Sequence, residues 1–282
     1  MEIIRTVAEL QTKAREARTK GSVGRVRTMG SLHDGHRSLV SRARRENDTV
    51  IVSVFVNPTQ FNNQADLATY PRTEAEDVAM LETEGVDYAF IPTVEEIYPE
   101  PDTRVFDLGP VAEVMEGAMR PGHFNGVAQI VSKLFAWASP TRAYFGEKDF
   151  QQIAVIRKMA ELEGFDDLAI VDCPILRESD GLALSSRNVR LTAEQRPLAP
   201  IISLTLKASV AKAREMTVKE TICWVTETLN RYPYMQVEYY EIVDALTMQP
   251  VCDWKETRQA VGCITCYCGD VRLIDNIKYP AE

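Results

Sequence analysis

The sequence lacks the features that mark membrane-spanning, secreted and nucleic-acid-binding proteins. Its 282 residues carry 32 Lys and Arg against 41 Asp and Glu, a formal net charge of −9, and so acidic a chain repels polyanions such as nucleic acid. No apolar run approaches the roughly 18 residues of a bilayer span. The first residues lack the cationic start and cleavage site of a signal peptide. These absences predict a cytoplasmic globular protein with no nucleic-acid or membrane partner.

Cysteine is present but gives no sign of a disulfide framework. The chain has six cysteines and no secretory signal, so we expect reduced thiols. Three of them form the pattern Cys263-x-x-Cys266-x-Cys268, which resembles half of a zinc site, yet no second Cys or His pair follows at the spacing of structural zinc. Because these cysteines alternate with Ile264 and Tyr267, we favour a buried strand over a metal site.

Apolar periodicity predicts alternating strands and helices up to about residue 175. Thr6-x-x-Glu9 has the pattern of a capping box and opens an amphipathic helix that stops at Gly21. The all-apolar strand 50–56 is typical of a parallel sheet covered on both faces. The fold class is therefore α/β, a Rossmann-like doubly wound parallel sheet that binds ligands at the carboxyl ends of its strands. The other predicted strands are 23–28, 88–91 and 142–145, and the other helices are 36–47, 73–84, 127–137 and 150–163.

The pattern changes after Pro174. Two helices are predicted at about 192–213 and 218–230, and two strands near 237–243 and 259–267. We expect a nucleotide-binding domain over residues 1–175 and a smaller α+β domain over 176–282. A short connection would place a cleft between the two domains, where ligands commonly bind.

The first segment that carries chemistry is Thr28-Met29-Gly30-Ser31-Leu32-His33-Asp34-Gly35-His36, between a strand and a helix. Glycines allow close backbone approach, and a helix N-terminus offers N–H groups to phosphate. Two of the three histidines of the chain stand here, where each can donate a hydrogen bond to phosphate without a fixed charge. An isolated pair could equally be a helix-surface pair or two metal ligands, but the strand-Gly-helix setting favours a nucleotide site.

Three further segments stand at strand ends or at the domain join. Residues 145–152, Phe-Gly-Glu-Lys-Asp-Phe-Gln-Gln, suit phosphate, magnesium or a ribose hydroxyl, although a capped helix with solvated charges has the same pattern. Residues 180–188, Asp-Gly-Leu-Ala-Leu-Ser-Ser-Arg-Asn, offer hydroxyls and a guanidinium to a triphosphate, or form a loop before a helix cap at Thr192. Residues 55–61 bring Gln60 to a strand end, or form a structural Asn-Pro turn.

Seven segments together resemble one enzyme family, the pantoate–beta-alanine ligases, also called pantothenate synthetases. The resemblance covers essentially the whole chain, and the histidine segment alone is shared with HIGH-motif nucleotidylyltransferases and class I aminoacyl-tRNA synthetases. The segments are Thr-Met-Gly-x-Leu-His-x-Gly-His at 28–36, Phe-Val-Asn-Pro-x-Gln-Phe at 55–61, Tyr-Pro-Arg-Thr at 70–73, Arg-Pro-Gly-His-Phe at 120–124, Phe-Gly-Glu-Lys-Asp-Phe-Gln-Gln at 145–152, Asp-Gly-Leu-Ala-Leu-Ser-Ser-Arg-Asn at 180–188 and Arg-Leu-Ile-Asp-Asn at 272–276.

The resemblance implies a two-step ligation. The pantoate carboxylate attacks the α-phosphate of ATP to give pantoyl adenylate and diphosphate, and the amine of β-alanine then displaces AMP to give pantothenate. The resemblance further implies ATP as a substrate with Mg²⁺, no permanently bound cofactor, no metal held by the protein, and a homodimer. Because the adenylate reacts with water, we expect the second domain to close over the site.

The resemblance also assigns the site residues by motif position. His36 takes the position of the proton donor, and Gln60 and Gln152 hold pantoate, with Gln60 also near β-alanine. The implied catalytic set is His33, His36, Lys148, Ser185, Ser186 and Arg187. The implied ATP-binding set is Met29, Gly30, Ser31, Leu32, His33, Asp34, Gly35, His36, Gly146, Glu147, Lys148, Asp149, Leu176, Leu184, Ser185, Ser186 and Arg187.

Two positions depart from the family pattern. Arg27 stands where the family usually has Pro before Thr-Met-Gly, which removes a fixed φ and adds a long cation beside the nucleotide site. Asn125 stands where Arg is common after His-Phe. Three other functions compete: a related nucleotidylyltransferase, against which Gln60 and Gln152 argue, a non-catalytic nucleotide-binding regulator, and a metalloenzyme built on the histidine pair, which lacks a third ligand.

Overall fold

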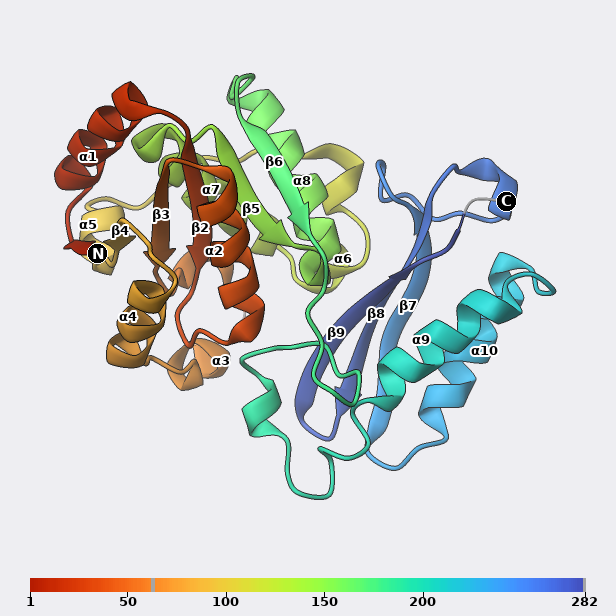
Figure 1. The fold of residues 1–282 in the computed structure, drawn as a ribbon. Coiled ribbons are helices and arrows are strands. Elements are labelled where there is room, and N and C mark those ends of the chain that lie inside the picture. The colour runs from red at the N-terminus through yellow and green to blue at the C-terminus, as the bar shows by residue number, and fades with distance from the viewer. Residues whose placement is uncertain (62–63, 281–282) are drawn as a thin grey trace.

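The computed structural model describes residues 1–61 and 64–280 and contains two lobes, each built on its own β-sheet (Figure 1). The larger lobe holds a six-stranded parallel sheet in the order β1–β4–β3–β2–β5–β6. The chain reverses its direction of travel across the sheet between β2 and β5, so the carboxyl ends of these two strands flank the crevice where such sheets bind ligands. The strands are β1 (Glu2–Ile4), β2 (Val23–Thr28), β3 (Thr49–Val54), β4 (Tyr88–Phe90), β5 (Arg142–Gly146) and β6 (Ala169–Cys173).

Helices cover both faces of this sheet. Apolar residues of α1 (Val7–Lys20), α7 (His123–Ala138) and α8 (Phe150–Leu162) pack on one face, and those of α2 (Asp34–Glu46) and α4 (Glu74–Thr83) pack on the other. Every residue of β3 is consequently buried, as its largely apolar sequence predicts. Shorter helices and turns make the connections: η1 (Pro58–Gln60), α3 (Gln64–Thr69), α5 (Val94–Ile97), η2 (Gly109–Ala112), α6 (Glu116–Met119) and η3 (Glu147–Asp149).

The smaller lobe is an antiparallel sheet with two helices on one face (Figure 1). Ile202 and Val225 from the helices pack with Ile264 and Leu273 from the strands in a core of its own. The fold class predicted from the sequence, a Rossmann-like sheet with a second, smaller α+β domain, is confirmed. The elements are η4 (Asn188–Arg190), α9 (Ile201–Lys212), α10 (Val218–Asn230), β7 (Met235–Asp244), η5 (Trp254–Glu256), β8 (Ala260–Cys268) and β9 (Val271–Lys278).

The three clustered cysteines lie on β8 with free, buried thiols. Cys266 and Cys268 belong to the core under the helices, whereas Cys263 faces the larger lobe beside Met115 and Val243. Residues 1–61 and 64–280 contain no group of three or more His, Cys, Asp or Glu side chains that could hold a metal ion. The burial of all three thiols on β8 confirms the prediction of a buried strand.

Several boundaries differ from those predicted. The helix predicted from 192 begins only at Ile201, because Pro197 and Pro200 interrupt helical backbone in the preceding turns. Helix α7 begins at His123, four residues before the predicted start. Strands β1, β6 and β9 were not predicted, and β9 holds the 272–276 motif. No described helix has the length and apolar content that crossing a bilayer requires.

Candidate active site

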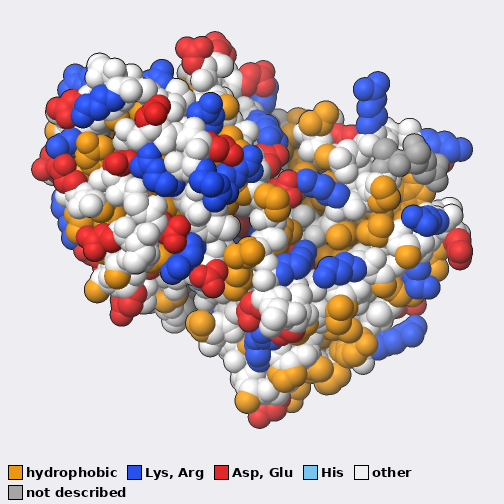
Figure 2. Space-filling view, viewed as in Figure 1, with side chains coloured by type: hydrophobic (Ala, Val, Ile, Leu, Met, Phe, Trp, Pro, Cys, Tyr) orange, Lys and Arg blue, Asp and Glu red, His pale blue; other side chains and the backbone are white. Residues whose placement is uncertain are grey.

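Two adjoining cavities lie at the carboxyl ends of β2 and β5. The smaller, about 190 Å³, contacts the turn after β2 and the loop 184–187. The larger, about 460 Å³, extends from the first to β7, β8 and β9 of the smaller lobe. Figure 2 shows the surface hollowed between the two lobes, with Lys and Arg side chains along the border of the hollow. The residues common to both cavities are Arg120, His123, Lys148, Asp149, Gln152, Ser185 and Arg187.

The backbone of the turn after β2 is fixed by hydrogen bonds to a buried carboxylate. The backbone N–H groups of Ser31 and Leu32 donate to the two carboxylate oxygens of Asp77 at 3.0 and 2.7 Å, and Asp77 is buried. Gly30 has a φ of +84°, and a Cβ there would stand 3.0 Å from Asp77 Oδ2. These amides are thus occupied, so residues 30–32 shape the turn, and side chains further along face the cavity. Sequence reasoning missed Asp77, which lies 46 residues from Ser31.

The two histidines of the turn are neutral hydrogen-bond donors. The N–H of Gly35 donates to His33 Nδ1 at 3.1 Å, and the N–H of His33 donates to His36 Nδ1 at 3.3 Å. Since a backbone N–H can only donate, both Nδ1 atoms accept, and the remaining proton sits on each Nε2. Burial is the main cause that lowers the pKa of His36 to about 3 and that of His33 to about 4, and the Lys148 cation lowers both further. The expected uncharged donors are therefore present.

The strand end at β5 adds a cation to the same cavity. Lys148 lines both cavities, and no carboxylate of the described residues lies within ion-pair distance of its ammonium group. Glu147 instead pairs with Lys278 of β9 at 2.5 Å, while Asn276 of β9 donates to the carbonyl oxygens of Glu147 and Lys148 at 2.7 and 3.2 Å. The smaller lobe thus holds the backbone from which Lys148 projects.

The loop after β6 brings the hydroxyls to the cavity. Ser185, Ser186 and Arg187 all line the smaller cavity. Ser185 Oγ accepts from the N–H of Arg187 at 3.2 Å, and Ser186 Oγ lies 3.4 Å from the Tyr70 hydroxyl. The loop is anchored where Arg177 pairs with Asp275 through two bonds of 2.6 and 2.9 Å. The hydroxyls and the guanidinium consequently face the histidine turn across the cavity.

Gln60 is held on three sides. It is buried, its Nε2 donates to the sulfur of Met29 at 2.9 Å, and its Oε1 accepts from the guanidinium of Arg27. Its carbonyl oxygen contacts His123 Nδ1 at 2.8 Å and accepts from Arg120 at 3.3 Å. Arg120 and His123 were outside the predicted site set, although the Arg-Pro-Gly-His-Phe motif signalled them.

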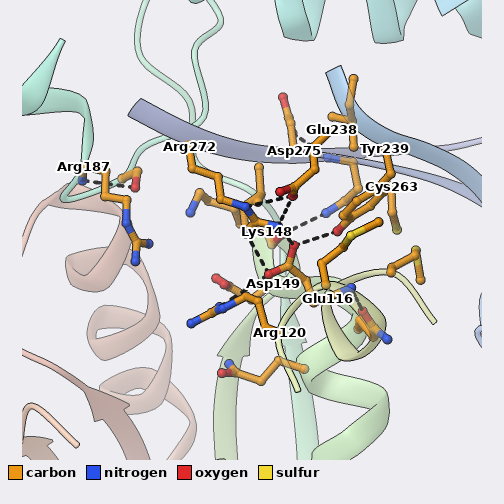
Figure 3. A pocket seen from close by; sticks show the side chains of 18 of the residues that line it. Glu116, Arg120, Lys148, Asp149, Arg187, Glu238, Tyr239, Cys263, Arg272 and Asp275 are labelled. Carbon is orange, nitrogen blue, oxygen red and sulfur yellow. Dashed lines mark hydrogen bonds and ion pairs between the residues drawn. The ribbon is translucent and has the colours of Figure 1, made fainter. Parts of the chain in front are cut away.

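Glu116 of α6 joins the lobes beside the larger cavity. Its carboxylate accepts two bonds from Arg272 of β9, at 2.6 and 2.9 Å, and one from the Tyr239 hydroxyl of β7 at 2.8 Å. Figure 3 shows Arg272 between Glu116 and Glu238, with which it also pairs at 2.5 Å. Burial opposes ionisation of Glu116, but Arg272 outweighs burial and lowers the pKa of Glu116 to about 2. The junction between the lobes is therefore charged and fully paired.

Most of the site residues that the resemblance implies meet at one place. The cavity-lining ones include Leu176 and Gly146, which line the smaller cavity, and Gln152, which lines both cavities. The substituted position Asn125 lies elsewhere, where its carboxamide bonds the backbone of residues 104 and 106. Implied residues that do not line the smaller cavity are Gly30, Ser31, Leu32, Asp34 and Glu147.

The fold and this site together define a class: an α/β protein with a Rossmann-like parallel sheet, whose candidate active site lies at the switch point of the sheet beside a Gly-His turn. The model of the family "Pantoate-beta-alanine ligase" matches residues 2–278. The chain belongs to this family. It is an ATP-dependent ligase that forms pantothenate from pantoate and β-alanine.

Individual relatives agree over the full length. A pantothenate synthetase of Porphyromonas gingivalis is 59% identical over 280 residues, 99% of each chain, and one of Bacteroides fragilis is 57% identical with the same coverage. The crystal structure of pantothenate synthetase from Thermus thermophilus matches with a TM-score of 0.92 at 45% identity, over 99% of this chain and 100% of that one. A pantoate-beta-alanine ligase from Francisella tularensis, complexed with a β,γ-ATP compound and β-alanine, matches with a TM-score of 0.82 at 33% identity, over 98% and 97%.

Proposed function

We propose that the smaller cavity holds pantoate and the reacting phosphates of ATP, with pantoate between Gln60 and Gln152. The observation that carries this placement is the neutral histidine pair facing Lys148 across the carboxyl ends of β2 and β5. Two uncharged Nε2–H donors and one ammonium group can follow charge as it develops on phosphate oxygens. The loop 184–187 adds hydroxyl and guanidinium donors from the opposite side.

In the first step the pantoate carboxylate oxygen attacks the α-phosphorus, and the bond from that phosphorus to diphosphate breaks. His36 donates its Nε2 hydrogen bond to the reacting phosphate, and Lys148 neutralises the negative charge of the phosphates. In the second step the amine of β-alanine attacks the acyl carbon, and AMP leaves. The chemistry needs orientation and charge more than covalent help from the protein.

Magnesium is expected to enter with ATP, since Mg²⁺ is usually bound by substrate phosphates with one or two carboxylates. Asp149 is exposed and lines both cavities, whereas Glu147 is engaged by Lys278. Asp149 is therefore the carboxylate that fits a water-bridged contact to this ion. No resident cofactor is proposed.

We place the domain boundary near residue 175, where β6 ends and the anchored loop begins. Closure of the smaller domain would keep water from the adenylate. The family resemblance further supports a homodimer that works in the cytoplasm.

The test measures AMP release by the purified protein with ATP, magnesium and pantoate, with and without β-alanine, and pantothenate by mass spectrometry. AMP and pantothenate that appear together only with β-alanine support the full assignment. Diphosphate exchange that depends on pantoate, without amide product, would indicate a stalled adenylating enzyme. Binding of ATP without turnover would indicate a non-catalytic regulator.

His36→Ala tests the assigned donor. We expect adenylation to fall by about 10²-fold or more, as when one positioned donor to a developing charge is removed, while circular dichroism stays that of the parent. His36→Gln, whose amide can donate, is the matched variant and should retain more activity. Adenylation by His36→Ala at the parent rate would remove His36 from its role.

A further inference from the structure

Arg27 is a cation without a carboxylate partner, inside the smaller cavity. It is the last but one residue of β2 and lines the cavity together with Met29, Gln60 and Gln152. Its guanidinium donates to Gln60 Oε1, and no carboxylate of the described residues lies within ion-pair distance of it. A guanidinium has five N–H donors in a planar fork, so further donors are available to a ligand.

The same face of β2 carries a second arginine. Side chains alternate along a strand, so Arg25 points to the same face as Arg27, one pleat further from the cavity. Arg25 is 1% exposed, and none of its three guanidinium nitrogens has a hydrogen-bond partner among the described residues. Arg25 and Arg27 thus lie next to each other on one face of β2, and no carboxylate of the described residues pairs with either guanidinium. A buried charge is stable only when it is paired, so binding of an anionic ligand beside Arg27 in the smaller cavity is strongly favoured.

We infer that Arg27 binds the carboxylate of pantoate and thereby determines affinity for that substrate. The inference rests on the proposed placement of pantoate between Gln60 and Gln152, since both amides line the cavity with Arg27. An arginine matches the two oxygens of a carboxylate with two parallel hydrogen bonds. The bond to Gln60 also turns the carboxamide oxygen toward Arg27, which fixes the orientation of Nε2.

The experiment compares the parent enzyme with Arg27→Gln and Arg27→Lys. KM is measured separately for pantoate and for ATP, and calorimetry measures binding of pantoate and of its neutral carboxamide analogue. Loss of a charge-assisted hydrogen bond costs about 1.5–3 kcal/mol, so Arg27→Gln should raise KM for pantoate roughly 10- to 150-fold. KM for ATP and the affinity for the carboxamide should stay unchanged, and Arg27→Lys should recover part of the loss.

Three outcomes would overturn the inference. A rise in KM for ATP instead of pantoate would make Arg27 a phosphate ligand. An equal loss for pantoate and its carboxamide would show that no carboxylate contact exists. Tighter binding of pantoate by Arg27→Gln would show that the side chain only obstructs the cavity. Failure of the proposed placement itself looks different, because Gln152→Ala would then leave KM for pantoate at the parent value. Thermal melting of the variants reports whether they fold.

Discussion

Arg25 costs the protein stability, and its replacement should reveal how much. The side chain lies in the apolar core, where its neighbours across the sheet are Ile51 of β3 and Ala143 of β5. Burial, together with the Arg27 cation, lowers the pKa of Arg25 from its ordinary value to about 9. That difference corresponds to roughly 5 kcal/mol at about 1.4 kcal/mol per pKa unit. Met keeps the unbranched stem and removes the charge.

Arg25→Met should therefore stabilise the protein by about 2–4 kcal/mol, since relaxation recovers part of the charge penalty. For a chain of this size the gain corresponds to a rise in Tm of roughly 5–15 °C. The assay is thermal melting by circular dichroism at pH 7, with Arg15→Met as the control because Arg15 is exposed on α1. The control should leave Tm within about 2 °C.

The dependence on pH gives a second readout. Below pH 9, the pKa of Arg25 in the folded protein, Arg25 is protonated in both the folded and the unfolded state. The extra stability of Arg25→Met over the parent is therefore constant there. Above pH 9 the unfolded state binds more protons than the folded state, so the free energy of unfolding of the parent rises with pH and the extra stability of Arg25→Met becomes smaller. A Tm for Arg25→Met at or below that of the parent at pH 7 would refute the reasoning, since it would mean that the guanidinium is compensated.

Two further predictions concern residues that position the site. Asp77→Asn removes the charge from the side chain that accepts hydrogen bonds from the N–H groups of Ser31 and Leu32, so we expect a loss of about 1.5–3 kcal/mol in stability and a higher KM for ATP. The control is Glu76→Gln, because Glu76 is exposed on the same helix. An unchanged Tm and an unchanged KM for Asp77→Asn would contradict the role of Asp77. Glu116→Gln should lower Tm at pH 7, because Arg272 loses one of its two carboxylate partners and keeps only Glu238. The deficit in Tm should vanish as pH falls from 4.5 toward 2, where the folded parent protonates Glu116 too; an equal deficit at pH 7 and pH 3 would exclude the carboxylate charge as its source.

The parts of the fold that the sequence predicted well are those with strong local signals. The capping box at Thr6 forms as expected, with the N–H of Glu9 donating to Thr6 Oγ1. Strand β2 has the predicted bounds, and β3 differs by one or two residues, because apolar runs between turn residues determine them locally. The start of α9 was wrong because two prolines outweighed the helical periodicity after residue 192.

The site was predicted as motifs but not as contacts. Its motifs sit at strand ends, so their meeting place followed from the topology of a parallel sheet. Asp77, in contrast, is an acidic residue on an ordinary helix, and only the fold brings it to the turn. Glu116 likewise bonds a residue 156 positions away. Such partners leave no spacing signal in a single sequence, so the structure alone identifies them.

The bonds from β9 to residues 147–148 limit how the two lobes can move relative to each other. Asn276 and Lys278 hold the backbone and side chain of residues 147–148 from the smaller lobe. A swing of that lobe must either break these bonds or pivot about them. If the smaller lobe pivots about these bonds, Lys148 stays almost in place, and the parts of the smaller lobe farthest from Lys148 move the most. Under the proposed function the two lobes could then open for substrates while Lys148, the cation assigned to the phosphates of ATP, keeps its position.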